Sequence, residues 1–323
     1  MNQQKKSYRT SKSTPPLKIA AVHDISCIGR CAQTVIIPVL SAMGVQVCPL
    51  PTALLSTHTG GYTGFTFLDL TTEMNSITNH WDKLGTTFDA VYSGFLGSAE
   101  QIHSVYDFAL KCKNNNPDCI FLADPVMGDD GNKYATYTDE MCRLTKKLVS
   151  CADIITPNIT EACLLLDIPY KTDFSDNEIR NMLISLSEIG SESVIITGIH
   201  RINKVGAAYY SKKNSAFGEY FTKSDPNNYP GAGDIFSSIV LASFLQKQTL
   251  RNSVAKACDF ILHASEYTTS LATPIREGLA IEALLSDLIC DRKENQQTIE
   301  IIIKICIYIK RKLLKTIDKS HKV

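Results

Sequence analysis

Six short apolar segments alternate with longer stretches of helical spacing, and this alternation constrains the fold more than any other feature of the sequence. Strands that are apolar on both faces and separated by helices are typical of a mostly parallel sheet with helices on both faces. Residues 206–222 are rich in β-formers and predict a small antiparallel edge. The predicted class is therefore α/β, with a mostly parallel central sheet. The apolar segments are residues 18–22, 45–50, 90–95, 119–123, 153–156 and 194–198.

Five helices are expected between these strands, and Pro38 is expected to kink the first of them. The expected helices are residues 28–43, 68–84, 98–114, 139–150 and 177–189.

The chain divides into one predicted domain and two flanking segments. We expect the domain to span residues 17–289. Residues 1–16 are polar and end in two prolines, which predicts a flexible arm. Residues 290–323 form a basic, isoleucine-rich tail, which fits either an amphipathic helix at a membrane surface or partner, or an added edge strand. The tail is too short and too charged to span a bilayer. The interpretation we favour is that it packs against the domain or a second subunit.

Composition excludes several classes of function. Lys plus Arg and Asp plus Glu both total 33, so no net charge favours nucleic acid or a membrane. The eleven cysteines include no CxxC pair, which argues against a disulfide framework and against zinc. We therefore expect reduced thiols and a cytoplasmic protein.

Polar residues lie at or just after the ends of five of the predicted strands. They are Asp24, Ser93, Asp124, Asn158 and Thr197. The carboxyl ends of parallel strands share one edge of a sheet, and ligands bind outside that edge. The sequence therefore predicts a ligand site there.

A glycine-rich turn, Gly231-Ala232-Gly233-Asp234, precedes an apolar helical pattern that runs to Leu245. Free amides and the positive end of the helix dipole favour an anion at such a turn. One hypothesis is that these amides stabilise a phosphoryl group in transfer while Asp234 takes the proton of the attacking hydroxyl. The alternative is that Asp234 caps the helix and the glycines only make a tight turn.

Two further acidic residues fit a magnesium–nucleotide site, because Mg²⁺ prefers oxygen ligands and neutralises phosphates. Asp124 ends a strand, and Glu161 lies in the first turn of a helix after Thr156-Pro157-Asn158. The alternative for Glu161 is an ordinary acidic residue at a helix N-terminus.

Taken in order, these motifs resemble the ribokinase-like superfamily and, within it, the pyridoxal/pyridoxamine (vitamin B6) kinases. The resemblance covers roughly residues 17–289. It rests on His23-Asp24, Leu55–Gly60 (LSTHTG), Tyr92–Gln101 (YSGFLGSAEQ), Asp124–Asp129 (DPVMGD), Ile155–Glu161 (ITPNITE) and Gly231–Asp234 (GAGD).

The resemblance implies an enzyme that transfers the γ-phosphoryl group of ATP to the 5′-hydroxymethyl group of pyridoxal, pyridoxamine or pyridoxine. It implies Asp234 as the catalytic base and Gly231, Ala232 and Gly233 as the anion hole. Asp124 and Glu161 match positions on the Mg²⁺ side, with Glu161 acting through metal-bound water. The other implied nucleotide contacts are Asn158, Thr197 and Tyr134, the last in a flap over ATP. The implied substrate contacts are Asp24, His58, Thr59, Phe95 and Asp234.

The resemblance also implies a homodimer and leaves a monovalent cation open as a further cofactor. Many pyridoxal kinases carry a serine at the position of Asp24, and an aspartate there is closer to hydroxymethylpyrimidine kinases. Conversely, Asp234 stands where some hydroxymethylpyrimidine kinases carry a cysteine. His58 also fits a simple hydrogen-bonded loop residue. A hydroxymethylpyrimidine (phosphate) kinase and a non-catalytic pyridoxal-binding protein therefore stay as alternatives.

Overall fold

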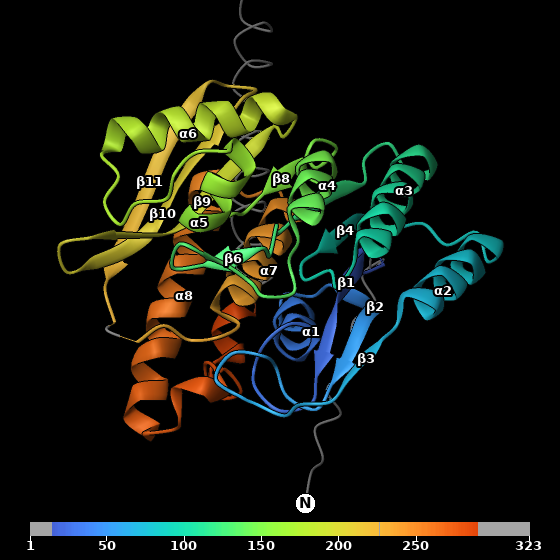
Figure 1. Ribbon diagram of the computed structural model, residues 1–323, viewed down its shortest axis with the longest axis horizontal. Coiled ribbons are helices and arrows are strands. Elements are labelled where there is room, and N and C mark those ends of the chain that lie inside the picture. The colour runs from blue at the N-terminus through green and yellow to red at the C-terminus, as the bar shows by residue number, and fades with distance from the viewer. Residues whose placement is uncertain (1–14, 226, 290–323) are drawn as a thin grey trace, which may run out of the picture. The chain divides into compact units, whose positions relative to one another are not determined.

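A nine-stranded sheet forms the centre of the structure, a computed structural model that describes residues 15–225 and 227–289 (Figure 1). Six neighbouring strands are parallel, and the sheet order is β11-β10-β9-β8-β5-β4-β1-β2-β3. The parallel strands are β1 (Lys18–Ser26), β2 (Gln46–Leu55), β4 (Ala90–Ser93), β5 (Ile120–Ala123), β8 (Ile154–Ile155) and β9 (Ser193–Arg201). The antiparallel strands are β3 (Phe67–Asp69), β10 (Lys204–Ser211) and β11 (Ala216–Lys223).

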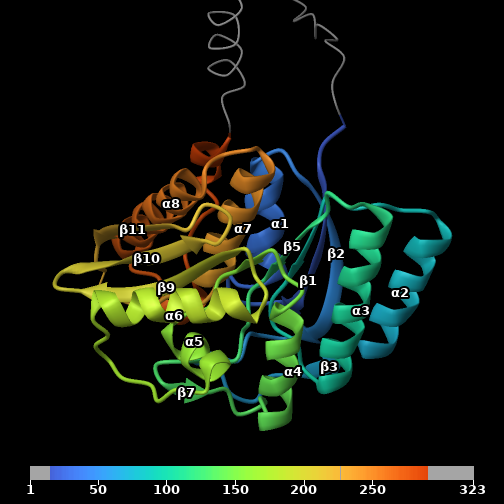
Figure 2. The same cartoon turned by 90° about the horizontal axis from the view of Figure 1, so that it is seen from above.

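Helices cover both faces of this sheet (Figure 2). One face carries α2 (Thr71–Lys83), α3 (Ala99–Asn115), α4 (Asp139–Val149), α5 (Ile159–Leu166) and α6 (Asp176–Ile189). The other carries α1 (Gln33–Ala42), α7 (Ala232–Leu245) and α8 (Leu250–Leu271). The short helices η1 (Ile275–Glu277) and η2 (Leu285–Leu288) follow α8, and a separate hairpin consists of β6 (Gly128–Asp129) and β7 (Asn132–Lys133).

Alternating side chains of the strands fill two separate cores. Ala20 and Val22 of β1 pack on the side of α2–α6, whereas Ile19 and Ala21 pack on the side of α1, α7 and α8. This confirms the predicted mostly parallel sheet with a small antiparallel edge.

Two predicted helices begin later than expected. Helix α1 starts at Gln33 and not at residue 28, because Gly29 (φ +102°) and Ala32 (φ +49°) lie outside the helical region of backbone conformation. Pro38 lies inside α1. Helix α2 starts at Thr71 and not at residue 68, because residues 67–69 pair with β2 as the edge strand β3.

Two predicted strands are longer than expected. Asp24 therefore lies within β1 and does not follow it, and β9 continues past Thr197 to Arg201. Arm residues 1–14 and the tail 290–323, with its two alternative interpretations, lie outside the described residues. Among the residues that are described, no helix is long and apolar enough to cross a membrane, and the cysteines are free thiols.

Candidate active site

Helix α7 begins at a turn that only glycine fits. Gly231 is its N-cap and has a left-handed backbone, with φ +79°. A Cβ atom at Gly231 would lie 2.1 Å from the carbonyl oxygen of Arg30. The amide of Ala232 donates to the Tyr229 carbonyl at 3.3 Å, so the amides of Gly233 and Asp234 are the better donors for an anion.

The carboxylate of Asp234 does not cap its own helix. Oδ2 accepts a 2.7 Å hydrogen bond from the amide of Ala32, which belongs to the loop before α1. Its main-chain carbonyl accepts bonds from the hydroxyls of Tyr92 and Ser238. The side chain is 15% exposed, so a ligand can reach it. The helix-cap interpretation of Asp234 is therefore wrong.

Burial raises the pKa of Asp234 to about 7, even though the Ala32 amide lowers the pKa; the negative charge of Asp24 raises it further. A carboxylate that titrates near neutrality suits proton abstraction at physiological pH.

Asp124 lies at the end of β5, buried below the same turn. Its Oδ2 accepts a 3.2 Å hydrogen bond from the hydroxyl of Ser237, and that hydroxyl lies 2.9 Å from the hydroxyl oxygen of Thr156. Burial raises the pKa of Asp124 to about 8, and Asp234 contributes to the rise. Two buried carboxylates thus face one region, where a cation would stabilise both in their ionised forms.

Asn158 and Glu161 form a capping box at the N-terminus of α5. The Asn158 side chain accepts from the Glu161 amide at 2.9 Å, and Glu161 Oε2 accepts from the Asn158 amide at 2.8 Å. Glu161 Oε1 accepts from the Met127 amide at 3.2 Å, and Asn158 Nδ2 donates to the Gly128 carbonyl at 2.9 Å. Glu161 therefore has the structural role that the alternative interpretation gave it.

The donor set fits a magnesium ion held together with phosphates. Among the described residues no group of three His, Cys, Asp or Glu side chains forms a metal cage. Burial raises the pKa of Glu161 well above its usual range, and the negative charge of Asp124 raises it further. Mg²⁺ binds through one or two carboxylates, several waters and substrate phosphates, so this pair suffices.

Two more predicted nucleotide contacts lie beside the capping box. Thr197 of β9 forms a parallel bridge with Asn158, and its amide donates to the Pro157 carbonyl at 2.9 Å. Tyr134 follows the β6–β7 hairpin and is exposed, and its amide donates to the Met127 carbonyl. Although the residue as a whole is exposed, partial desolvation of the Tyr134 hydroxyl, together with the negative charge of Glu161, raises the pKa of that hydroxyl.

The predicted substrate loop folds onto the segment after α8. His58 Nδ1 accepts from the Gly60 amide at 3.1 Å, and Nε2 lies 2.6 Å from the Arg276 carbonyl, to which it donates. With both nitrogens bonded, His58 shapes the loop and has no free polar atom for a ligand. Thr59 beside it is exposed.

Asp24 and Phe95 complete the predicted substrate side. Asp24 is buried, Ser26 donates to its Oδ2 at 2.9 Å, and burial raises its pKa. Phe95 follows β4 and is half-buried, and its carbonyl accepts from the hydroxyl of Thr52 at 3.2 Å.

Sequence reasoning missed the buried side chain that fixes the loop carrying Phe95. Gln101 Oε1 accepts from the Gly97 amide at 2.8 Å, and its amide nitrogen donates to Thr52, Asp69 and Thr71. Sequence reasoning quoted His23 only as part of a motif, with no role, and it did not single out Ser237. A polar residue inside an apolar strand or helix was the available signal for both.

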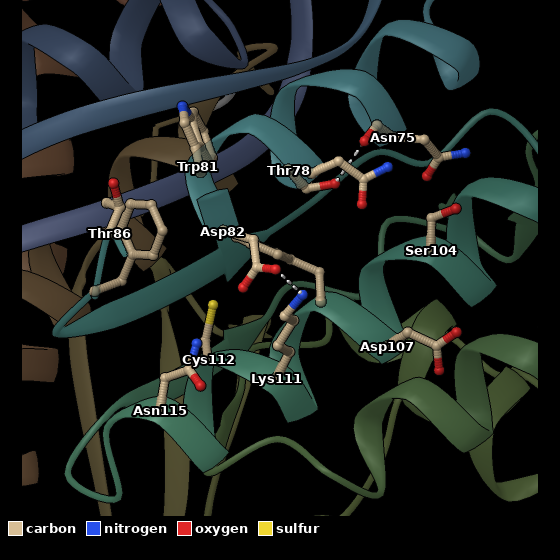
Figure 3. Close-up of a pocket in the computed structure, with 13 residues that line it drawn as sticks. Asn75, Thr78, Trp81, Asp82, Thr86, Ser104, Asp107, Lys111, Cys112 and Asn115 are labelled. Carbon is tan, nitrogen blue, oxygen red and sulfur yellow. Dashed lines mark hydrogen bonds and ion pairs between the residues drawn. The ribbon is translucent and has the colours of Figure 1, made fainter. Parts of the chain in front are cut away.

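A hollow of about 250 Å³ lies elsewhere, between α2 and α3, where Trp81 and the Asp82–Lys111 ion pair line it (Figure 3). It shares no residue with the cluster around Asp234.

The comparisons with known proteins agree with this geometry. Residues 37–276 match the phosphomethylpyrimidine kinase family. A pyridoxal kinase, PdxY, of Histophilus somni is 30% identical over 216 residues, which are 64% of this chain and 73% of that protein. A hydroxymethylpyrimidine/phosphomethylpyrimidine kinase of Haemophilus influenzae is 32% identical over 189 residues, which are 57% of this chain and 65% of that protein.

A solved structure is more similar still. A protein of Bacteroides thetaiotaomicron, provisionally named a phosphomethylpyrimidine kinase and crystallised with pyridoxal, is 43% identical. It aligns with a TM-score of 0.81 over 84% of this chain and 96% of that one. The chain thus belongs to the phosphomethylpyrimidine kinase family, and it is a kinase with the ribokinase-like fold.

Proposed function

We propose that this kinase transfers the γ-phosphoryl group of ATP to the 5′-hydroxymethyl group of a B6 vitamer: pyridoxal, pyridoxamine or pyridoxine. The pyridoxal in the 43% identical Bacteroides structure supports this substrate class. The observation that carries the proposal is the carboxylate of Asp234. It is bonded away from its own helix, reachable from solvent and shifted in pKa to about 7.

Asp234 takes the proton of the substrate hydroxyl as the oxygen attacks the γ-phosphorus. A primary alcohol is a weak nucleophile, and general-base assistance contributes about 10²–10⁴-fold to the rate of such a step. In the turn Gly231–Asp234, the amides of Gly233 and Asp234 bind the phosphoryl oxygens, because the N–H groups of a first helical turn have no acceptor within the helix. Positioning and charge neutralisation supply the rest of the catalysis.

The nucleotide lies on the side of Asn158, Glu161 and Thr197, with Tyr134 over it. Asp124 and Glu161 are the carboxylates that would hold Mg²⁺, Glu161 through water. When bound, Mg²⁺ neutralises the charge of the transferring phosphates. The protein itself fixes these carboxylates through Ser237, Asn158 and Met127.

The vitamer lies on the side of Asp24, Thr59 and Phe95. Phe95 supplies an aromatic face for the pyridine ring, and Asp24 supplies a buried carboxylate for a ring substituent. His58 contributes by holding the loop against the Arg276 carbonyl.

A hydroxymethylpyrimidine (phosphate) kinase is the second candidate. The family match and the 32% identical relative from Haemophilus influenzae favour it, and an aspartate at position 24 fits it. Both candidates require Asp234 to take the proton of the substrate hydroxyl, since each phosphorylates a hydroxymethyl group on a nitrogen heterocycle.

A coupled assay of ADP release separates the candidates. The purified chain is given ATP with pyridoxal, pyridoxamine, pyridoxine or hydroxymethylpyrimidine, with Mg²⁺ and with EDTA. We expect Mg²⁺-dependent ADP release with the B6 vitamers. Release with the pyrimidine alone would reject the B6 assignment, and no release with any substrate would favour a non-catalytic pyridoxal-binding protein.

The family resemblance supports three further proposals. We infer a homodimer, a cytoplasmic location and one catalytic domain over residues 17–289. Sedimentation at several protein concentrations tests the dimer. Replacement of K⁺ by tetramethylammonium in the same assay tests whether a monovalent cation is a cofactor.

A further inference from the structure

A fully buried histidine lies beside Asp234 without any hydrogen bond from its ring. His23 of β1 is 0% exposed, and its Nδ1 lies 3.8 Å from Oδ1 of Asp234, which is too long for a hydrogen bond. Burial lowers the pKa of His23 to about 3, so the ring is neutral and the contact is not an ion pair. Among the described residues only five buried side-chain polar atoms lack a partner, and both ring nitrogens of His23 are among them.

Such atoms are rare in folded proteins because their desolvation is not compensated. An apolar residue at position 23 would avoid this cost, since Ile19 and Ala21, which precede it on the same face of the strand, are apolar core residues. Packing alone therefore does not explain why a histidine occupies this position.

Packing does fix the ring in its place. The ring meets Tyr92 edge to face, with centroids 4.3 Å apart and an angle of 70° between the planes. On its other side lies Gly94, where a Cβ atom would come within 2.3 Å of the ring atoms Cε1 and Nδ1. Gly94 is itself anchored, because its amide donates to the Val22 carbonyl at 3.1 Å. The ring is thus held with Nδ1 toward Asp234.

We propose that His23 is a positioning residue for the catalytic base: its Nδ1–H donates to Oδ1 of Asp234 when substrate is bound. This inference rests on the proposed function. A closing movement of about 1 Å brings Nδ1 and Oδ1 into hydrogen-bond range. Both carboxylate oxygens then have a fixed donor, Ala32 on Oδ2 and His23 on Oδ1, and a remaining lone pair faces the substrate hydroxyl.

His23 keeps its proton throughout this step. The proton of the substrate hydroxyl moves to Asp234 as the new oxygen–phosphorus bond forms and the bond between the γ-phosphorus and the bridging oxygen of ADP breaks; ADP leaves with that oxygen, and the proton leaves Asp234 for solvent after transfer. The low basicity of the buried ring excludes His23 as the final acceptor of that proton.

Two substitutions at position 23 test the role. His23→Phe keeps a ring in the slot but removes the donor, and we expect kcat for pyridoxal to fall on the order of 10²-fold, the effect of a misplaced reacting group. The KM for ATP should not change. His23→Asn places an amide nitrogen near the position of Nδ1, and it should recover at least a tenth of the wild-type kcat.

A double-mutant cycle with Asp234→Asn shows whether His23 acts through the base. If it does, His23→Phe causes no further loss in the Asp234→Asn background. Ser243→Ala is the matched control, because the Ser243 hydroxyl on α7 is also buried without a partner and lies outside the site. It should leave kcat unchanged, and melting temperatures confirm that each variant folds.

The outcomes separate the two claims. A wild-type protein that phosphorylates no B6 vitamer overturns the proposed function and with it this role. If the wild type is active and Asp234→Asn is not, the proposed function stands. In that case His23 is not a positioning residue if His23→Phe keeps full kcat, if asparagine restores no more activity than phenylalanine, or if the losses at the two positions simply multiply.

Discussion

Two carboxylates of the candidate site, Glu161 and Asp234, differ in how many hydrogen bonds their oxygens accept from the rest of the protein. Glu161 is 3% exposed, and each of its oxygens accepts a backbone amide, from Met127 and from Asn158. Asp234 is 15% exposed and has one fixed donor, while the nearest group to its other oxygen is His23 at 3.8 Å. The side that we propose binds the nucleotide is therefore held by hydrogen bonds within the chain, whereas the proposed transfer end keeps hydrogen-bonding capacity for a ligand.

The largest expected effect is on turnover when Asp234 loses its charge. Asp234→Asn keeps an oxygen for the Ala32 amide but cannot act as a base, so we expect kcat to fall by about 10²–10⁴-fold. Binding of ATP should persist, because the proposed nucleotide contacts Asn158, Glu161 and Thr197 are unchanged. Steady-state kinetics and nucleotide titration check this, and wild-type turnover in the variant would show that Asp234 is not the base.

The same substitution should change stability in a pH-dependent way. The folded pKa of Asp234, about 7, lies above the unfolded value of 3.8, so the folded state binds more protons between these pH values. Stability from this group is therefore lost as pH rises from about 4 to 7, by roughly 2–4 kcal/mol.

Asp234→Asn removes that loss. We expect its free energy of unfolding to exceed that of the wild type at pH 8, with a difference that shrinks toward pH 4. Urea unfolding at both pH values measures this. An equal difference at both would mean that Asp234 is an ordinary exposed acid.

The turn that presents Asp234 can be altered with a close control. Gly231→Ala imposes a left-handed conformation on alanine and also places Cβ against the Arg30 carbonyl. Gly44 has nearly the same φ, +80°, but nothing lies within 4 Å of its would-be Cβ.

Both alanine variants should lose about 1–2 kcal/mol from backbone strain. Only Gly231→Ala should lose more than that, together with most of its kcat. Unfolding free energies and kcat for the pair check the prediction, and equal losses would show that the approach of Arg30 has no effect.

The smallest effect is expected on the nucleotide side. Asn158→Ala removes the cap of α5 and the bond to the Gly128 carbonyl, and we expect a loss of about 1–2 kcal/mol with a higher KM for ATP. Ser175 caps α6 in a capping box of the same kind, away from the site. Ser175→Ala should cost about 1 kcal/mol and leave both kinetic constants unchanged. A KM for ATP that is equal in both variants would mean that Asn158 only caps a helix.

Much of this site could be predicted because it depends on short-range patterns. Asp124 and Asn158 follow buried strands, and parallel strands place their carboxyl ends on one edge. Gly231 and Asp234 were recognisable because glycine precedes a helical pattern. The same reasoning predicted a start of α1 that is too early. Ala32 adopts a positive φ, and an alanine in a sequence does not indicate such a conformation.

Side-chain partners distant in the chain were not predictable. The Ala32 amide bonds to a carboxylate 202 residues away, and the buried Gln101 amide joins Thr52 to the Phe95 loop. His58 lies in a loop whose composition is typical of a ligand-binding loop. Its two ring nitrogens are nevertheless hydrogen-bonded to the Gly60 amide and the Arg276 carbonyl.

The sequence by itself determined the α/β sheet, the edge that carries the candidate site and the helix that begins within the turn Gly231–Asp234, because strand periodicity, strand ends and glycine turns are local properties. Only the tertiary structure decided which donors reach Asp234, that the Met127 amide bonds to Glu161 and that the ring of His23 is buried without a hydrogen-bond partner. The surroundings of His23 and Asp234 depend on packing between β1, β4 and α7, which lie far apart in the sequence, and on the desolvation that this packing imposes.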